Sequence, residues 1–209
     1  SVMPGMAVAG TDEEAILVFV TGAEDDGYNP SDATTATRTD TPLREITQSI
    51  QVIPQQVLED QGITRIGDAL RNVSGVTPQR DRSNASDRFS IRGFDTSRIL
   101  RNGFRTGVGF GDATGVSPNV VERIEVIKGP ASVLYGQVEP GGVVNYITKQ
   151  PLDEPFYNFQ IRAGSFGLIE PAIDIAGPLT EDRRLTYRLN ASYQDSDSFR
   201  DFVDLQAIS

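Results

Sequence analysis

Neither cysteine nor histidine occurs in this chain of 209 residues. Without cysteine, the chain can form neither a disulfide framework nor a thiolate metal site. Without histidine, it lacks the commonest metal ligand and the commonest general base, and a Ser-His-Asp triad is impossible. These absences count against most hydrolytic and zinc-dependent enzymes.

Long apolar runs and an excess of positive charge are missing as well. The longest clearly apolar run, Ala15 to Val20, is far shorter than the ~20 residues that a helix needs to span a bilayer. The strands of a β-barrel would escape this test, because they alternate between apolar and polar residues. The formal net charge of −10 argues against a nucleic-acid partner. The chain begins at Ser1 without the basic and apolar segments of a signal peptide, so we expect a processed or excised piece.

No other pattern replaces the missing catalytic groups. Glu122 and Glu125 are three residues apart, which on a strand predicts opposite faces and a poor acid–base pair. The glycine-rich stretch Gly107 to Gly111 lacks the Lys-Ser/Thr ending of a phosphate loop. The acidic residues show no EF-hand spacing. We therefore predict no catalytic residue, no resident metal and no cofactor, and the chain is not expected to be an enzyme.

The most informative segment runs from Val121 to Lys149. Its first part alternates between two faces and predicts a strand that ends at Gly129-Pro130. One helical turn should follow, and Gly141-Gly142 then permits a sharp reversal into a second strand.

A compact domain is predicted around this segment. Gln55 to Gln61 has a helical composition, and Thr64 is expected to cap a helix that continues through Asn72. Short strands are predicted at Ser49–Pro54, Phe89–Phe94 and Ser97–Asn102, and a long glycine-rich loop at 103–115.

Both ends of the chain differ from this domain. The first 41 residues have the composition of a flexible tail, interrupted by one β-prone island at 15–21. That island is either an edge strand of a sheet or a motif that pairs with a partner by strand addition. After Pro151 the residues alternate, which fits either a transmembrane barrel wall or an ordinary half-buried sheet.

We predict a meander of three antiparallel strands between Phe156 and Phe202, with a turn at Leu179 to Asp182. In a barrel, one face would point to lipid through Phe159, Ile161, Leu185, Tyr187, Leu189 and Tyr193. The other face would point to the lumen through Arg162, Asp174, Arg188 and Asn190.

The residue order of Val121 to Lys149 closely resembles the plug domain of TonB-dependent outer-membrane receptors. Phe89 to Phe94 is similar to the plug's Arg-Gly-Phe motif, and Asp40 to Gln61 is similar to its opening. The resemblance implies an α+β plug domain at 42–151, with a mixed sheet and short helices. It also implies that 152–209 forms the first antiparallel strands of a 22-stranded transmembrane β-barrel.

The same resemblance implies a function. Members of this family import ferric siderophores across the outer membrane, energised by TonB, and iron enters only as part of that ligand. The expected partners are the TonB C-terminal domain, a ferric siderophore and outer-membrane lipid, with the plug and the tail facing the periplasm. Three strands cannot close a barrel, so we expect an N-terminal fragment of a receptor. The alternative is a truncated soluble plug module that binds TonB or ligand without transport.

Three groups of site residues are implied by the resemblance. The TonB box, which would bind TonB by strand addition, is Ala15, Ile16, Leu17, Val18, Phe19, Val20 and Thr21. Apical loops would touch the siderophore through Arg80, Arg82, Phe104, Arg105 and Phe110. A lock between plug and barrel would use Arg92, Glu122, Arg123 and Lys128, although an internal salt-bridge network of the plug is the other interpretation.

Overall fold

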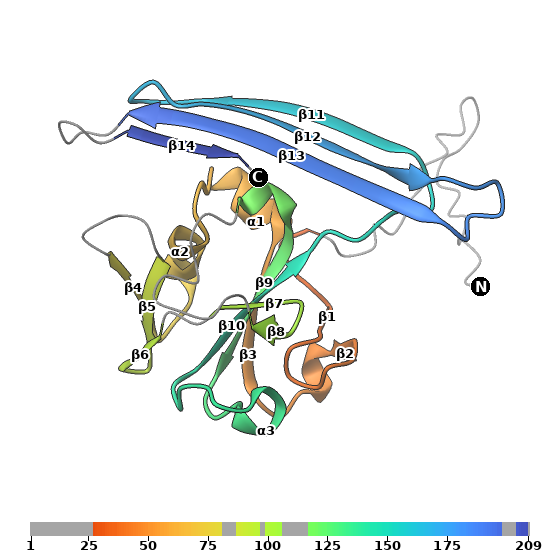
Figure 1. Cartoon of the computed structure of the whole chain (residues 1–209). Coiled ribbons are helices and arrows are strands. Elements are labelled where there is room, and N and C mark those ends of the chain that lie inside the picture. Colours follow the sequence, from red (N-terminus) through yellow and green to blue (C-terminus); the bar gives the residue numbers. More distant parts are fainter. Residues whose placement is uncertain (1–26, 81–86, 97–98, 106–116, 198–203, 209) are drawn as a thin grey trace, which may run out of the picture.

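The computed structural model describes residues 27–80, 87–96, 99–105, 117–197 and 204–208. A mixed α/β body lies against one side of a long four-stranded sheet (Figure 1). In the described ranges, no helix combines the length and the apolar character needed to cross a membrane.

A five-stranded mixed sheet forms the centre of the body. Its order is β3-β9-β10-β7-β8, in which β10 pairs with β7 in parallel and the other neighbours are antiparallel. The strands are β3 (Ser49–Pro54), β7 (Ile99–Arg101), β8 (Phe104–Arg105), β9 (Val121–Lys128) and β10 (Gly142–Thr148). The predicted strand–turn–strand unit is therefore confirmed as β9, the short helix α3 (Ser132–Tyr135) and β10.

Smaller elements surround this sheet. The antiparallel strands β4 (Val76–Arg80), β5 (Asp87–Ile91) and β6 (Phe94–Thr96) form a second sheet, and β1 (Asp32–Ala33) pairs with β2 (Thr41–Pro42). The helical segments are η1 (Leu43–Glu45), α1 (Gln55–Asp60), α2 (Ile66–Ala69), η2 (Leu70–Asn72) and η3 (Pro118–Val120). The predicted cap at Thr64 is wrong, because α2 begins after an extended Arg65 and has no side-chain cap. Burial of Ile66, Ala69 and Leu70 holds this helical segment instead.

Apolar side chains cover both faces of the central sheet. One cluster packs α1 and α2 against Ile53, Ile124 and Val144. The second cluster includes Ile127 and Tyr135 and lies on the other face. Because both faces are covered, the side chains of β9 are buried or half-buried along the whole strand instead of alternating between buried and exposed.

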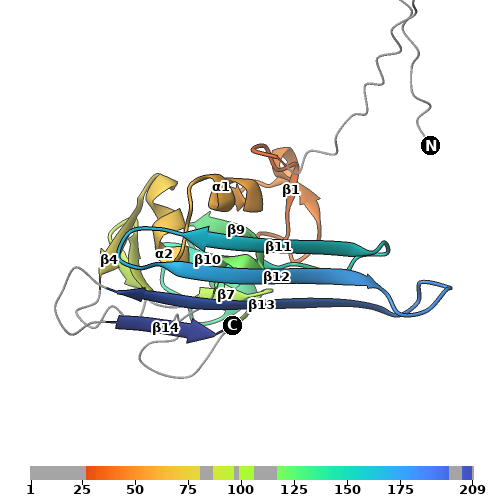
Figure 2. The ribbon, with the colours of Figure 1, turned by 90° about the horizontal axis from the view of Figure 1, so that it is seen from above.

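The four-stranded sheet follows the body in the sequence. Its strands are β11 (Phe156–Ala163), β12 (Ile169–Pro178), β13 (Thr186–Asp197) and β14 (Asp204–Ile208), each antiparallel to the next. The three antiparallel strands predicted between Phe156 and Phe202 are confirmed as β11, β12 and β13. A fourth strand, β14, lies beyond that range, and its five residues are too few for an alternation to identify. The turn predicted at Leu179 is confirmed, and its amide donates to the Leu185 carbonyl at 2.7 Å. Figure 2 shows the sheet extending along the whole length of the body.

Candidate functional site

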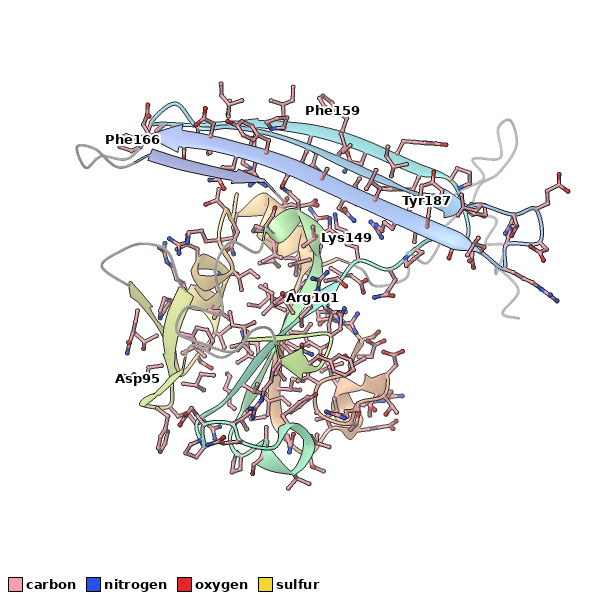
Figure 3. The ribbon with its side chains drawn as sticks, in the orientation of Figure 1. Asp95, Arg101, Lys149, Phe159, Phe166 and Tyr187 are labelled. Carbon is pink, nitrogen blue, oxygen red and sulfur yellow. The ribbon has the colours of Figure 1, made fainter. Side chains whose placement is uncertain are left out.

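The two faces of the four-stranded sheet differ in character. On the outward face, Phe159, Ile161 and Leu189 are 66, 64 and 54% exposed. On the face toward the body, Glu170 and Asp174 are buried. Figure 3 shows Lys149 between the body and the sheet, and Phe159 on the opposite side of the sheet. The predicted division of these strands into an apolar and a polar face is confirmed.

Asp174 is the centre of the first polar contact between the body and the sheet. Lys149 Nζ lies 3.0 Å from Asp174 Oδ2, and Arg188 Nη2 lies 2.7 Å from the same oxygen. All three side chains are nearly buried. Arg188 also donates to the Gln150 carbonyl at 2.8 Å, so the segment that leaves β10 is tied to both β12 and β13.

Glu170 is the centre of a second contact on the same face. Asn119 Nδ2 donates to its Oε1 at 2.8 Å, and Arg162 Nη1 donates to its Oε2 at 2.9 Å. Arg162 also reaches the Ile63 carbonyl at 3.3 Å, which links β11 to the loop after α1. The two buried acids of the four-stranded sheet thus accept hydrogen bonds from Asn119 and Lys149 of the body and from two arginines of the sheet itself.

Arg123 lies in a carboxylate network of the body rather than at the four-stranded sheet. Its Nε donates to Glu125 Oε1 and its Nη1 to Glu122 Oε1, both at 2.7 Å. Burial alone would lower the pKa of the Arg123 guanidinium, but the surrounding carboxylates, Glu125 foremost, outweigh burial and raise it. The arrangement matches the internal network that was the other interpretation of the predicted lock.

A β-bulge lets Arg123 reach both glutamates. The register of β10 against β9 skips one residue between Ile147 and Thr148, and Glu122 is the extra residue of β9. Bulges re-aim side chains, which explains why Glu122 meets Arg123 although simple alternation predicts that it faces away. The side chain of Glu125 is fully buried, whereas that of Glu122 is 36% exposed.

Arg92 and Lys128 form a separate cationic pair. Lys128 Nζ donates to Gln51 Oε1 at 3.1 Å and to Ser74 Oγ at 2.8 Å. Burial and the nearby charge of Arg92 lower the pKa of Lys128. Among the residues that the structure describes, no carboxylate forms a salt bridge with either cation. The β5–β6 turn that carries Arg92 lies at the side of the body away from the four-stranded sheet (Figure 1).

The predicted ligand residues are only partly described. Phe104 is 75% exposed, and Arg105 donates to the Tyr135 carbonyl at 3.2 Å and to that of Gln137. Arg80 ends β4, while Arg82, Phe110 and the segment 15–21 lie outside the described residues. Of this group, the structure describes the side chains of Phe104 and Arg105, which are neighbours in β8. The described part of the chain contains no cluster of three or more acidic residues that could hold a metal ion.

Sequence reasoning missed several residues of these networks. The alternation predicts that Asp174 lies on the lumen face, but it does not predict the partner Lys149, which follows a strand. Nor does the sequence indicate that Glu125 is the acceptor of a buried network. The available signal was an ionisable residue inside an otherwise apolar strand, because such a residue needs a partner when it is buried.

The structure as described is a compact body seated on the polar face of an antiparallel sheet whose outer face is apolar. This is the architecture of an outer-membrane barrel with an internal plug. Residues 42–143 match the TonB-dependent Receptor Plug Domain family. The chain belongs to the TonB-dependent receptors and comprises a plug domain and the initial strands of a barrel.

Individual relatives agree with this assignment. The metal-pseudopaline receptor CntO of Pseudomonas aeruginosa is 40% identical over 182 residues, which cover 87% of this chain and 26% of that protein. The ferrichrome outer membrane transporter/phage receptor of Escherichia coli is 34% identical over 160 residues, 74% of this chain and 21% of its own. The solved pyoverdine receptor FpvA of P. aeruginosa, bound to pyoverdine, superposes with a TM-score of 0.77 at 31% identity, over 85% of this chain and 26% of that one. The chain thus spans about a quarter of the length of the relatives it matches.

Proposed function

We propose that this chain supplies the plug and first barrel strands of an outer-membrane receptor that imports a ferric siderophore or a similar metal chelate, energised by TonB. One observation carries the proposal: the plug covers the polar face of a sheet whose other face exposes Phe159, Ile161 and Leu189. Such a face suits lipid. A soluble plug module would leave it in water, so the alternative of a module without transport is less well supported.

The cargo is inferred from the relatives. Their names refer to metal-pseudopaline, ferrichrome and ferripyoverdine, which are all metal chelates. The protein would then act as a receptor and transporter, not as an enzyme, with iron as cargo. Exposed Phe104 suits contact with such a ligand through its aromatic face. Arg80, Arg82, Arg105 and Phe110 complete the proposed contact group.

We also propose the domain layout and the TonB contact. Residues 1–41 would face the periplasm and bind TonB through the box at 15–21, with their last part, from Ser31, packed on the plug. The plug at 42–151 and the barrel strands at 152–209 would follow. The plug family match at 42–143 and the start of β11 at Phe156 support these limits.

The proposed lock is best supported for Arg92 and Lys128. The β5–β6 turn that carries Arg92 lies on the side of the plug away from β11–β14 (Figure 1), and Lys128 is close enough to feel the charge of Arg92. No described carboxylate forms a salt bridge with either cation. Acidic groups of a facing barrel wall would do so. Arg123 and Glu122 have partners within the plug, so their contribution to the lock would be indirect.

Uptake of radioactive iron tests the proposal. Cells that express the full-length receptor and a deletion strain would be supplied with ⁵⁵Fe bound to pyoverdine, ferrichrome or ferrioxamine. We expect at least one chelate to enter only through the intact receptor, and deletion of residues 15–21 should abolish entry while leaving chelate binding to cells. Uptake that is equal in both strains for the whole panel, with equal growth under iron limitation, would contradict the proposal.

A further inference from the structure

Residues Ser31 to Leu43 form a closed loop on the plug. The Leu43 amide donates to the Ser31 carbonyl at 3.0 Å, and β1 pairs with β2 so that both ends of the loop meet. The Arg38 amide donates to the Thr34 carbonyl at 2.7 Å, which tightens the loop internally. Compact loops of this length with close ends are frequently functional. Most of this segment belongs to the first 41 residues, whose composition predicts a flexible tail.

One carboxylate fastens this loop to the central sheet. Glu125 Oε2 accepts from the amides of Thr34 at 3.0 Å and Thr35 at 2.7 Å. Its Oε1 accepts from the Thr34 hydroxyl at 3.3 Å and from Arg123 Nε at 2.7 Å. The Glu125 side chain has no exposed surface, and Thr35 is 1% exposed. Both oxygens therefore face donors only, in an environment where a lost partner is costly.

Two further side chains hold Thr35 from the sides. Tyr135 donates its hydroxyl hydrogen to the Thr35 carbonyl at 2.6 Å, and Asn145 Nδ2 donates to Thr35 Oγ1 at 2.8 Å. The guanidinium of Arg38 lies 5.1 Å from the centre of the Tyr135 ring. Of the loop's apolar residues, Ala33 and Ala36 are buried. Two alanines bury little apolar surface, so hydrogen bonds dominate this attachment.

The main apolar core of the plug packs without the loop. The larger apolar cluster, which packs α1 and α2 against the central sheet, contains no residue of the loop. At the far side, the plug is tied to the barrel strands through Asp174 and Glu170. If the loop opens, Arg123 can still donate to Glu125 and Glu122, because both of these hydrogen bonds lie outside the loop.

We infer that the loop Ser31–Leu43 is a separable clasp, fastened by Glu125, that opens as one unit while the rest of the plug stays folded. The biological role of the clasp rests on the proposed function, which this inference deepens. The clasp connects the plug with the segment that is proposed to bind TonB. Force on that segment would therefore act on the clasp first. Its opening uncovers the Glu125–Tyr135–Asn145 face of the central sheet.

Native-state hydrogen exchange on the full chain in detergent tests the clasp. Glu125→Gln removes the charge and places an amide NH₂ either against the Thr34 and Thr35 amides or against Arg123 Nε, so one set of donors loses its acceptor. Glu122→Gln changes a neighbour that also contacts Arg123 but for which no contact with the loop is seen. We expect Glu125→Gln to speed exchange at the amides of 34, 35 and 38 by about tenfold to a hundredfold. The ladder amides of β9 and β10 should stay within about twofold of the original protein, and Glu122→Gln should leave the loop amides unchanged.

The unaltered protein supplies a second test in low denaturant. Loop amides should exchange through a local opening that depends little on denaturant, while ladder amides should depend on it strongly. Equal protection and equal denaturant dependence in the loop and the ladder would overturn the inference, as would unchanged loop exchange in Glu125→Gln or loss of the whole fold in that variant. Neither TonB nor siderophore is present, so failure here would leave the proposed transport function standing.

Discussion

At the residue scale, the buried charges of this molecule are each matched by several donors. Asp174 binds Lys149 and Arg188, and Asn190 donates to both its oxygens when its amide nitrogen faces them. Among the described residues, no buried side-chain nitrogen or oxygen lacks a hydrogen-bond partner. Removing one member of such a group leaves the others buried and under-satisfied, which costs more than the pair contributes.

Arg188→Leu should therefore destabilise the junction between plug and barrel strands. It leaves Asp174 with Lys149 and Asn190 alone and frees the Gln150 carbonyl. We expect the free energy of unfolding to fall by about 2–4 kcal/mol, measured by denaturant titration in detergent. As a control, Arg184→Leu removes an exposed arginine whose Nε lies 3.4 Å from Asp182 Oδ2. This substitution should change the free energy of unfolding by less than about 1 kcal/mol. Equal effects of the two substitutions would show that the Asp174 group is not a structural junction.

Tyr135 should make the stability of the plug depend on alkaline pH. Burial raises the pKa of its hydroxyl, so the folded state favours the protonated form that donates to Thr35. The contribution of this hydrogen bond, about 1 kcal/mol, is present below pH ~10 and is lost as the pH rises through the folded-state pKa. Tyr135→Phe should cost that amount at pH 7, and its difference from the original protein should shrink above pH ~10. A difference that grows with pH would contradict the assignment.

At the scale of elements, turns and close approaches place the strands. Arg92-Gly93 and Asn102-Gly103 both have positive φ angles, of 51° and 86° and of 50° and 80°, and close two-residue hairpins. This geometry matches the twist of the flanking strands. Gly141 has another reason to be glycine: a Cβ there would lie 2.1 Å from the Ile91 carbonyl oxygen. The expected sharp reversal is therefore also a close contact between the backbone just before β10 and the end of β5.

Gly141→Ala should consequently be severe, since backbone and not a flexible side chain blocks the added methyl group. We expect a loss of more than about 3 kcal/mol or failure to fold. Gly62→Ala adds a methyl group into open space at a positive φ of 59° and should cost only about 1–2 kcal/mol. Thermal unfolding followed by circular dichroism compares the two. A milder effect at 141 than at 62 would refute the close-approach argument.

The elements also show what sequence can and cannot predict. The alternation of β11–β13 and the Gly-Pro stop after β9 are local signals, and both led to correct elements. The packing of the clasp on the plug leaves no such signal, because its threonines and alanines have the composition of a tail and its partner Glu125 is 91 residues from Thr34. The same limit applies to Asp174 and Lys149, whose contact depends on how the plug sits against the strands. Pairings between distant segments leave no periodic signal in the sequence.

At the scale of the whole molecule, the account rests on one spatial relation. The plug lies on one side of the strands β11–β14, and the other side is available to lipid (Figures 1 and 2). Polar side chains that face the plug therefore alternate with outward-facing apolar side chains along β11–β13, and a shift of one residue would exchange them. The plug and the barrel strands thus specify one another: the polar contacts of the plug require the same register that places apolar side chains outside.

Spin labels along β11 test this relation most directly. This chain contains no cysteine, so in a full-length receptor without other cysteines the single cysteines introduced at 157, 158, 159, 160 and 161 each carry one label. None of these residues belongs to the Asp174 or Glu170 groups. In the full-length receptor in lipid, we predict high accessibility to oxygen, the lipid-phase quencher, at 157, 159 and 161 and low accessibility at 158 and 160. Accessibility without a two-residue period, or with the opposite phase, would contradict the assignment of these strands to a membrane wall with the plug inside.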